Sequence, residues 1–200
     1  QLRDEVMTMV LAGHETTAMA LSWSWWLLAR HPEAARALRG ELTRVLDGRA
    51  PTIEDLPQLS HTRATVAEAI RLYPPAWVIG RRSLVDLSVG GWDVPSGSIL
   101  VTVPYAQHRD PHYWTEAAAF RPERWLRADG AYDESAPEVP RGSWIPFGFG
   151  NRRCIGEQFA WTEAVLVLAT IASHWELRVD PSVAVRMQAG MTLRPRGIPA

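Results

Sequence analysis

The sequence is poor in cysteine, in net charge and in long apolar runs. A single cysteine, Cys154, in 200 residues excludes an internal disulfide and fits a reducing compartment. Twenty-one Lys and Arg residues balance 22 Asp and Glu residues, and the net charge of −1 does not suggest a nucleic-acid or membrane-surface binder. The longest apolar stretch, residues 164–172, is too short to cross a bilayer, and no repeat or secretory leader is visible.

What is present predicts a mainly α fold with small antiparallel β regions. Apolar residues make up 46% of the chain, and ten tryptophans require a large buried area. Side chains spaced by three and four predict a long helix over residues 2–29, and further helices are expected from Pro32 to Gly48, over 62–72 and over 159–172. Alternating apolar residues predict a small sheet over 81–105 and short strands over 176–179 and 183–193, turning at Ala189-Gly190.

The only cysteine lies in a glycine-rich segment just before a predicted helix. The segment reads Phe147-Gly148-Phe149-Gly150-Asn151-Arg152-Arg153-Cys154-Ile155-Gly156. Free N–H groups and the helix dipole at a helix start favour the thiolate, which is the form of cysteine that binds metals. Gly150 and Gly156 would let the backbone approach a large planar group, while Phe147 and Phe149 would keep water from the sulfur. An inert buried cysteine is the alternative, but the arginines, glycines and helix start argue against it.

The middle of the first predicted helix contains a glycine and two threonines, which are poor helix formers. They lie in Ala12-Gly13-His14-Glu15-Thr16-Thr17, where a loosened helix could admit a small ligand or water. Ordinary packing or a close helix crossing is the competing explanation. His14-Glu15 also resembles half of a zinc-binding HExxH motif, but Ala18 stands where the second histidine is needed.

Together these segments resemble the cytochrome P450 superfamily of haem-thiolate monooxygenases. The cysteine segment matches the family's haem loop, FxxGxRxCxG, at Phe147, Gly150, Arg152, Cys154 and Gly156. The resemblance implies that these residues bind haem, that Cys154 is the axial ligand of the haem iron, and that Arg152 contacts a propionate. Residues 12–17 match the oxygen-binding stretch AGx(D/E)T(T/S). This match gives Glu15 the acid position and implies that Thr16 helps to deliver protons.

Three further motifs extend the resemblance. Glu68-Ala69-Ile70-Arg71 matches the family's ExxR, and residues 120–125 resemble its PERF motif, with Trp125 in place of phenylalanine. A solvated helix-surface pair is the ordinary explanation of such a Glu and Arg. The resemblance implies instead that Glu68, Arg71 and Arg124 form a buried structural ion triad. Residues 107–111 resemble the family's HRDP turn.

The region after the ExxR helix is similar to other parts of the same family. Arg81 matches a second propionate-binding arginine, with Arg82 as the alternative. Residues 76–79 correspond to a lining of the substrate pocket, although an ordinary core role explains them equally well.

The resemblance covers nearly the whole chain but only the carboxyl-terminal part of the family's fold. Residues 1–200 are therefore expected to be the haem-binding part of one larger domain, inactive alone. The resemblance implies haem b and the insertion of one oxygen atom from O2 into an apolar organic substrate. Electrons would come from NAD(P)H through a ferredoxin- or flavoprotein-type redox partner.

Several alternatives stay open at this point. A peroxide-dependent peroxygenase or isomerase needs no reductase, and a non-catalytic haem-binding protein or truncated remnant needs no turnover. A cysteine hydrolase lacks an identifiable histidine to activate Cys154. We expect no nucleic-acid partner, no membrane segment in this chain and a cytoplasmic location, with an anchor upstream of Gln1 as an open alternative.

Overall fold

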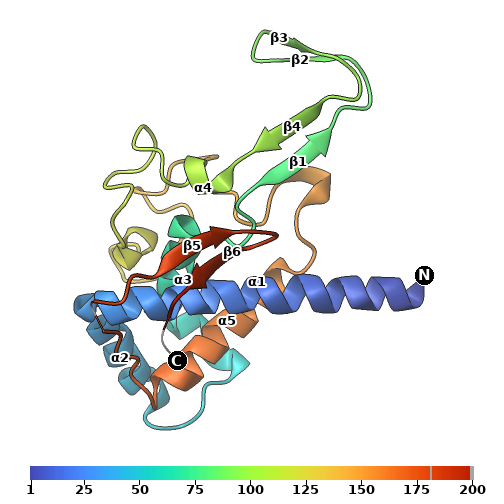
Figure 1. Cartoon of the computed structure of the whole chain (residues 1–200). Helices are drawn as coiled ribbons and strands as arrows, with labels where there is room; N and C mark the ends of the chain where they lie inside the picture. Colours follow the sequence, from blue (N-terminus) through green and yellow to red (C-terminus); the bar gives the residue numbers. More distant parts are fainter. Residues whose placement is uncertain (181, 199–200) are drawn as a thin grey trace.

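The computed structural model describes residues 1–180 and 182–198, and its body is built from helices (Figure 1). The long helices are α1 (Leu2–Arg30), α2 (Pro32–Leu46), α3 (Ser60–Leu72) and α5 (Glu157–Ala172). A single turn, α4 (Pro104–Gln107), and three 3-10 turns, Ile53–Gln58, Pro122–Trp125 and Gly150–Arg152, complete the helical elements of the described residues. The predicted mainly α fold with small antiparallel sheets is confirmed. No helix in these ranges is long and apolar enough to cross a membrane.

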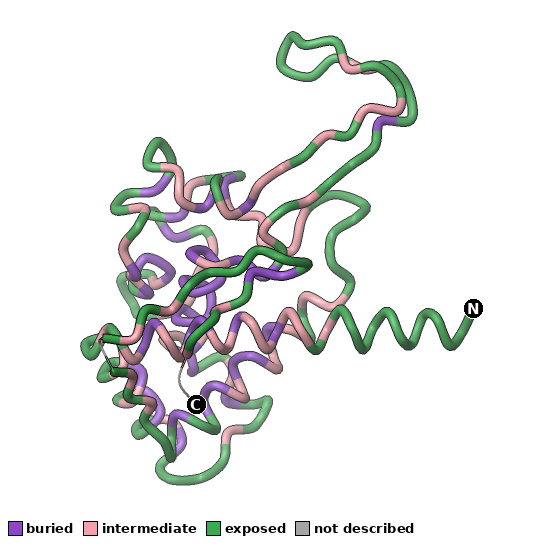
Figure 2. Tube along the Cα trace, viewed as in Figure 1, coloured by how far each residue is buried: buried purple, intermediate pink, exposed green. Residues whose placement is uncertain are grey.

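The core lies where the carboxyl-terminal half of α1 meets α2, α3 and α5. Leu59, Ala64 and Leu168 are completely buried there. The first turns of α1 extend away from this core and are exposed (Figure 2), so that Val6 is 51% and Leu11 65% exposed. The predicted apolar stripe of this helix is therefore buried only over its second half.

The region after α3 forms a ribbon that projects from the helical body (Figure 1). Strand β1 (Ile79–Arg82) pairs antiparallel with β4 (Ile99–Thr102), and β2 (Leu87–Val89) pairs with β3 (Trp92–Val94). The single sheet predicted over 81–105 is thus two separate ladders, because the chain between them makes no strand pairing. The β2–β3 turn uses Gly90 and Gly91 at φ 57° and 86°, a conformation that glycine adopts readily.

A second hairpin, β5 (Arg186–Ala189) with β6 (Leu193–Arg196), lies along α1 (Figure 1). Its turn falls at the predicted position, next to Ala189. The strand predicted over residues 176–179 is wrong: this segment is irregular. It runs past α1 and α2, and no strand of residues 1–180 and 182–198 pairs with it, whereas a strand needs a paired backbone to satisfy its N–H and C=O groups.

Aromatic rings form a continuous cluster between α3, the loop of residues 110–145 and α5. Trp125 is central, with ring centroids 4.6 Å from Trp144, 5.9 Å from Trp114 and 6.4 Å from Tyr132. Tyr132 and then Trp161 continue the cluster, and Phe147 packs 5.6 Å from the Trp161 ring. This aromatic cluster connects the core with the segment that carries Cys154.

Candidate functional site

The cysteine segment is a tight loop that leads into α5. Gly148 and Gly150 adopt φ values of 71° and 67°, which side-chain-bearing residues rarely adopt. The Cys154 N–H donates to the Phe147 carbonyl over 2.9 Å and closes the loop, and Gly156 is the N-cap of α5. Cys154 therefore lies three residues before the first residue of the helix, close to its free N–H groups.

The surroundings of the thiol are apolar and open. Cys154 is exposed, and its neighbours Phe149, Ile155 and Phe159 are 65%, 93% and 68% exposed. Phe147 is partly buried against the aromatic cluster instead. An accessible sulfur bordered by apolar side chains fits a large apolar group that carries a metal ion able to bind thiolate.

The arginines predicted to hold propionates are free to do so. Arg152 is exposed and makes no side-chain hydrogen bond or ion pair within residues 1–180 and 182–198, whereas Arg153 pairs with Glu157. Among the described residues, the Arg81 side chain donates to its neighbouring carbonyl, that of Gly80, at 2.9 Å and to no other group.

Strand geometry separates Arg81 from Arg82. The Ile79 Cδ1 atom lies 3.9 Å from where a Cβ on Gly148 would be, so the start of β1 contacts the cysteine loop. Alternate residues of a strand share a face, which places Arg81 on the side of Ile79. Arg82 is turned toward Gly97, with its Nη2 atom 3.6 Å from an ideal Cβ there. The geometry therefore favours Arg81 over Arg82 as the arginine of this site.

The stretch from Gly13 to Thr17 is regular α-helix. The loosening considered from the sequence is absent, since α1 is helical throughout Leu2–Arg30. The Thr16 hydroxyl donates to the Ala12 carbonyl over 2.7 Å, four residues back. This bond uses the hydroxyl proton and leaves the Thr16 oxygen available as an acceptor.

Glu15 is held by two residues that the sequence did not indicate. Its Oε1 atom accepts hydrogen bonds from Thr192 Oγ1 at 2.5 Å and from Arg194 Nη2 at 2.6 Å and Nε at 3.0 Å. These hydrogen bonds, first that of Thr192 and then that of Arg194, hold the pKa of the Glu15 carboxyl below its ordinary value. Neither partner belongs to a motif, and both lie more than 170 residues away in sequence.

The structure brings Glu68, Arg71 and Arg124 together in the interior, each with a fully buried side chain. Arg71 forms a two-point pair with Glu68 at 2.8 and 2.9 Å, and Arg124 Nε donates to Glu68 Oε1 at 3.0 Å. Trp125 Nε1 and the Arg121 N–H add donors at 2.9 and 3.0 Å. The carboxylate thus accepts five hydrogen bonds, three of them from guanidinium groups.

His108 is a second buried polar residue that links distant segments. Its Nε2 atom accepts the Ile145 N–H over 3.1 Å, and Nδ1, which must then carry the proton, has no partner in the described chain. Burial, and secondarily the charge of Arg71, lowers the pKa of His108 to about 3. The neutral imidazole therefore ties the turn before Asp110 to the segment that enters the cysteine loop.

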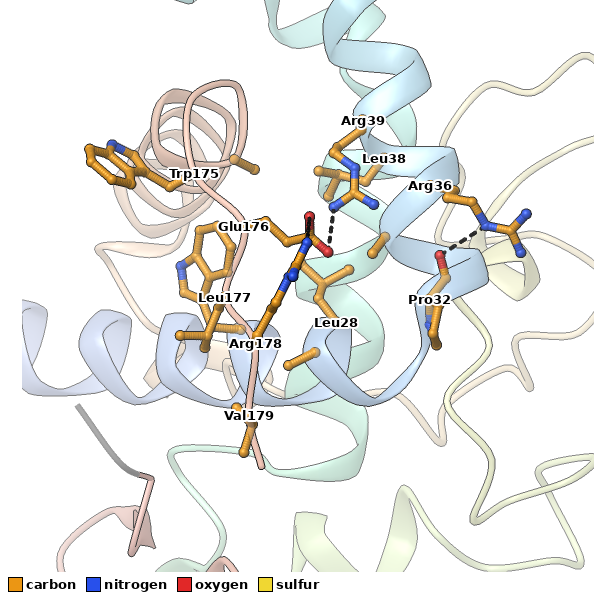
Figure 3. A pocket seen from close by; sticks show the side chains of 14 residues that line it. Leu28, Pro32, Arg36, Leu38, Arg39, Trp175, Glu176, Leu177, Arg178 and Val179 are labelled. Atoms are coloured by element: carbon orange, nitrogen blue, oxygen red, sulfur yellow. Dashed lines mark hydrogen bonds and ion pairs between the residues drawn. The ribbon is translucent and has the colours of Figure 1, made fainter. Parts of the chain in front are cut away.

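A pocket lies away from the cysteine loop, at the other end of the helical body. A pocket of about 350 Å³ opens between the end of α1, α2 and the irregular segment after α5 (Figure 3). Leu28, Leu38 and Leu177 form its apolar wall, while Arg39 approaches Glu176 to 3.7 Å at its rim. None of the site residues predicted from the sequence lines it. Within residues 1–180 and 182–198, no three His, Cys, Asp or Glu side chains cluster as a metal site.

Comparison with known proteins identifies the class. The family model described as cytochrome P450 matches residues 1–197, so the chain belongs to the cytochrome P450 family. This membership implies haem as the cofactor.

Individual relatives match most of this chain. Cyclooctatin synthase from Streptomyces melanosporofaciens is 45% identical over 96% of this chain and 41% of its own length. Pentalenene oxygenase from Streptomyces avermitilis is 40% identical over 96% of this chain and 42% of its own length. The chloroplastic carotene epsilon-monooxygenase of Arabidopsis thaliana is 36% identical over 96% of this chain and 35% of its own length. The chain therefore spans about two fifths of the length of the curated relatives it matches.

Proposed function

We propose that this chain is the haem-binding, carboxyl-terminal part of a cytochrome P450 that inserts one oxygen atom from O2 into an apolar organic substrate. The observation that carries the proposal is the exposed Cys154 thiol, bordered by exposed apolar side chains before α5. The limited coverage of the relatives, 41% for cyclooctatin synthase, supports assigning residues 1–200 to one part of a larger domain. On this proposal the 200-residue chain alone has no turnover.

The residues around Cys154 fit haem by their chemistry. The Cys154 thiolate would bind the iron, Arg152 and Arg81 would meet the propionates, and Phe149 and Ile155 would cover apolar ring surface. Gly150 and Gly156 keep the loop free of side chains where the ring would lie. The bound haem supplies oxygen activation, which thiolate ligation favours by donating electron density to the iron.

The residues on α1 would handle protons. Because the Thr16 hydroxyl donates to Ala12, its oxygen can accept a hydrogen bond from water and hold that water in place. Glu15, the next residue, offers a carboxylate that exchanges protons with solvent. We assign proton delivery to these two residues.

The substrate class follows from the names of the relatives. They are named for cyclooctatin, pentalenene and carotene, and we propose a terpenoid or similar hydrocarbon-rich substrate for this protein. Electrons are proposed to come from NAD(P)H through a ferredoxin- or flavoprotein-type partner. A cytoplasmic location and the absence of a nucleic-acid partner are proposed from the sequence alone.

A spectroscopic experiment tests the site. In the haem-loaded enzyme the ferrous carbon monoxide adduct should show the red-shifted Soret band of thiolate ligation, and Cys154→Ala should abolish it. Asn151→Ala, in the same exposed loop, is the matched control and should keep the band. Survival of the band in Cys154→Ala would disprove the assignment, because the sequence has no other cysteine.

A turnover experiment separates the alternatives. Product that requires NAD(P)H and a redox partner supports the monooxygenase. Product with peroxide alone would favour a peroxygenase, and spectral shifts with apolar compounds without product would favour a non-catalytic haem-binding protein.

A further inference from the structure

The acid on the oxygen-binding helix is bonded to the carboxyl-terminal hairpin. Three hydrogen bonds, one from Thr192 and two from Arg194, converge on Oε1 of Glu15. The other oxygen, Oε2, accepts no hydrogen bond from the part of the chain that the structure describes. The two carboxylate oxygens are therefore inequivalent: one is saturated by donors and the other is free to exchange a proton.

The hairpin that supplies these donors is itself fixed in place. The Nε1 atom of Trp23, a residue of α1, donates to the Leu193 carbonyl over 2.9 Å. The Leu193 N–H donates to the Pro75 carbonyl over 3.3 Å, and Trp77 Nε1 donates to the Gly190 carbonyl over 2.9 Å. Strand β6 therefore bridges α1 and the segment after α3, and these bonds hold the backbone that carries Thr192 and Arg194 beside Glu15.

The charges around Glu15 favour its ionised form. Thr192 is 4% exposed, while the Glu15 and Arg194 side chains are 28% and 53% exposed, so the pair is accessible to solvent on one side. Arg194 on β6 and His14 on α1 are the charged or titratable groups that act on this carboxylate, and both lower its pKa. Thr192 lowers it further by donating its hydroxyl. Glu15 is thus held as an anion with one fixed oxygen.

We propose that Arg194 and Thr192 are positioning residues that fix the Glu15 carboxylate through Oε1, leave Oε2 to exchange protons, and set the pH at which Glu15 delivers them. The role in proton delivery rests on the proposed monooxygenase function. Protons enter from solvent at Oε2, and Arg194 keeps the carboxylate from retaining them. When the reaction consumes a proton, Glu15 passes one on and takes up another from solvent, without remaining protonated in between.

An infrared titration tests the first half of this proposal without turnover. Difference spectra between the haem-loaded protein and its Glu15→Gln variant isolate the carboxyl bands of Glu15 as a function of pH. Arg194→Gln should raise the titration midpoint of Glu15 by roughly half a pH unit or more, since it removes a charge in direct contact. Thr192→Val should raise it less, and Arg196→Gln, which removes the same charge two residues along β6, should leave it unchanged.

A pH profile of coupling tests the second half. Coupling is the fraction of reduced cofactor recovered as product. In Arg194→Gln, the midpoint of the acid-side change in coupling should move to higher pH by the same interval as the infrared midpoint. Arg194→Lys, which keeps the charge, should restore most of the wild-type profile. If Arg194→Gln cannot be isolated folded, Thr192→Val decides by the same two measurements.

The outcomes are distinct. An unchanged Glu15 midpoint in the folded variants overturns the proposal, and so does a shifted midpoint with an unchanged coupling profile. A wild-type full-length P450 containing this chain that yields no product from reduced cofactor refutes the proposed function instead, while the infrared result still decides whether the hairpin controls Glu15.

Discussion

Replacement of Arg71 should remove much of the folding stability of the protein. Its side chain is fully buried and donates five hydrogen bonds of 2.7 to 2.9 Å. Two reach Glu68, and three reach the backbone carbonyls of His108, Ala117 and Ala119. A single side chain thus makes the two-point pair with the carboxylate and satisfies a loop that has no regular secondary structure to pair its backbone.

The magnitude follows from these contacts. Removing one partner of a buried ion pair costs about 3–5 kcal/mol, and the lower end applies here because Arg124 Nε still donates to Glu68. Each buried carbonyl left without a donor adds about 1 kcal/mol or more. The total is comparable to the whole stability of many domains, about 5–15 kcal/mol. Arg71→Ala should therefore yield little soluble, haem-loaded protein.

A milder variant makes the loss measurable. Arg71→Lys keeps the charge, but a single ammonium cannot replace five donors in a planar fork, so the free energy of unfolding should fall by about 2–4 kcal/mol. Urea unfolding of the haem-loaded protein, followed by tryptophan emission, measures it. Arg127→Ala is the control, since its pair with Asp129 is 52% and 60% exposed and should contribute less than about 1 kcal/mol. Equal losses in Arg71→Lys and Arg127→Ala would refute the reasoning.

Three further predictions follow from the same structure. Thr16→Ala should leave haem binding intact while diverting reduced cofactor into hydrogen peroxide; unchanged coupling would contradict its assignment to proton delivery. The pKa of His108 in the folded protein is about 3, below its ordinary value of 6.5. Between these two pH values the unfolded chain binds more protons than the folded protein, so the free energy of unfolding should fall as the pH drops from 6.5 toward 3. His108→Gln should flatten that fall, by up to about 1.4 kcal/mol per pH unit, in unfolding experiments at pH 4 to 7; parallel curves for the two proteins would count against it. Trp125→Phe should retain the fold but lose about 1.5–3 kcal/mol of unfolding free energy through the missing hydrogen bond to Glu68, and an unchanged urea midpoint would argue that this bond is not formed.

Much of the helical part of the fold could be predicted from local sequence. Pro32 ends α1 and opens α2, and Gly48 follows the end of α2, because proline and glycine act through their own backbone geometry. The exposure of Val6 and Val10 could not be predicted, because an apolar spacing indicates a face but not what covers it.

The strands show where local reasoning fails. Residues 176–179 alternate in polarity as a strand does, but alternation does not provide a partner, and none lies beside this segment. The β5–β6 hairpin has its partner only four residues away, which is why its turn could be located from the sequence.

Some residues of the candidate site could be predicted from local sequence, and others could not. Cys154, Arg152 and the glycines lie within ten residues, so a local motif is enough to find them. Thr192 and Arg194 reach Glu15 only because β6 lies along α1, and a contact across 177 or more residues leaves no local pattern. His108 was visible only as part of a turn motif, since its bond to Ile145 depends on how two loops pack.

The aromatic cluster around Trp125 gives the protein an optical signal of its own tertiary order. Rings fixed 4.6 to 6.4 Å apart in an asymmetric interior should produce strong near-ultraviolet circular dichroism. A compact state that keeps its helices but loses this packing would keep the far-ultraviolet spectrum and lose the near-ultraviolet one. Because Trp125 also donates to Glu68, that spectrum would report the integrity of the buried ion cluster without any label.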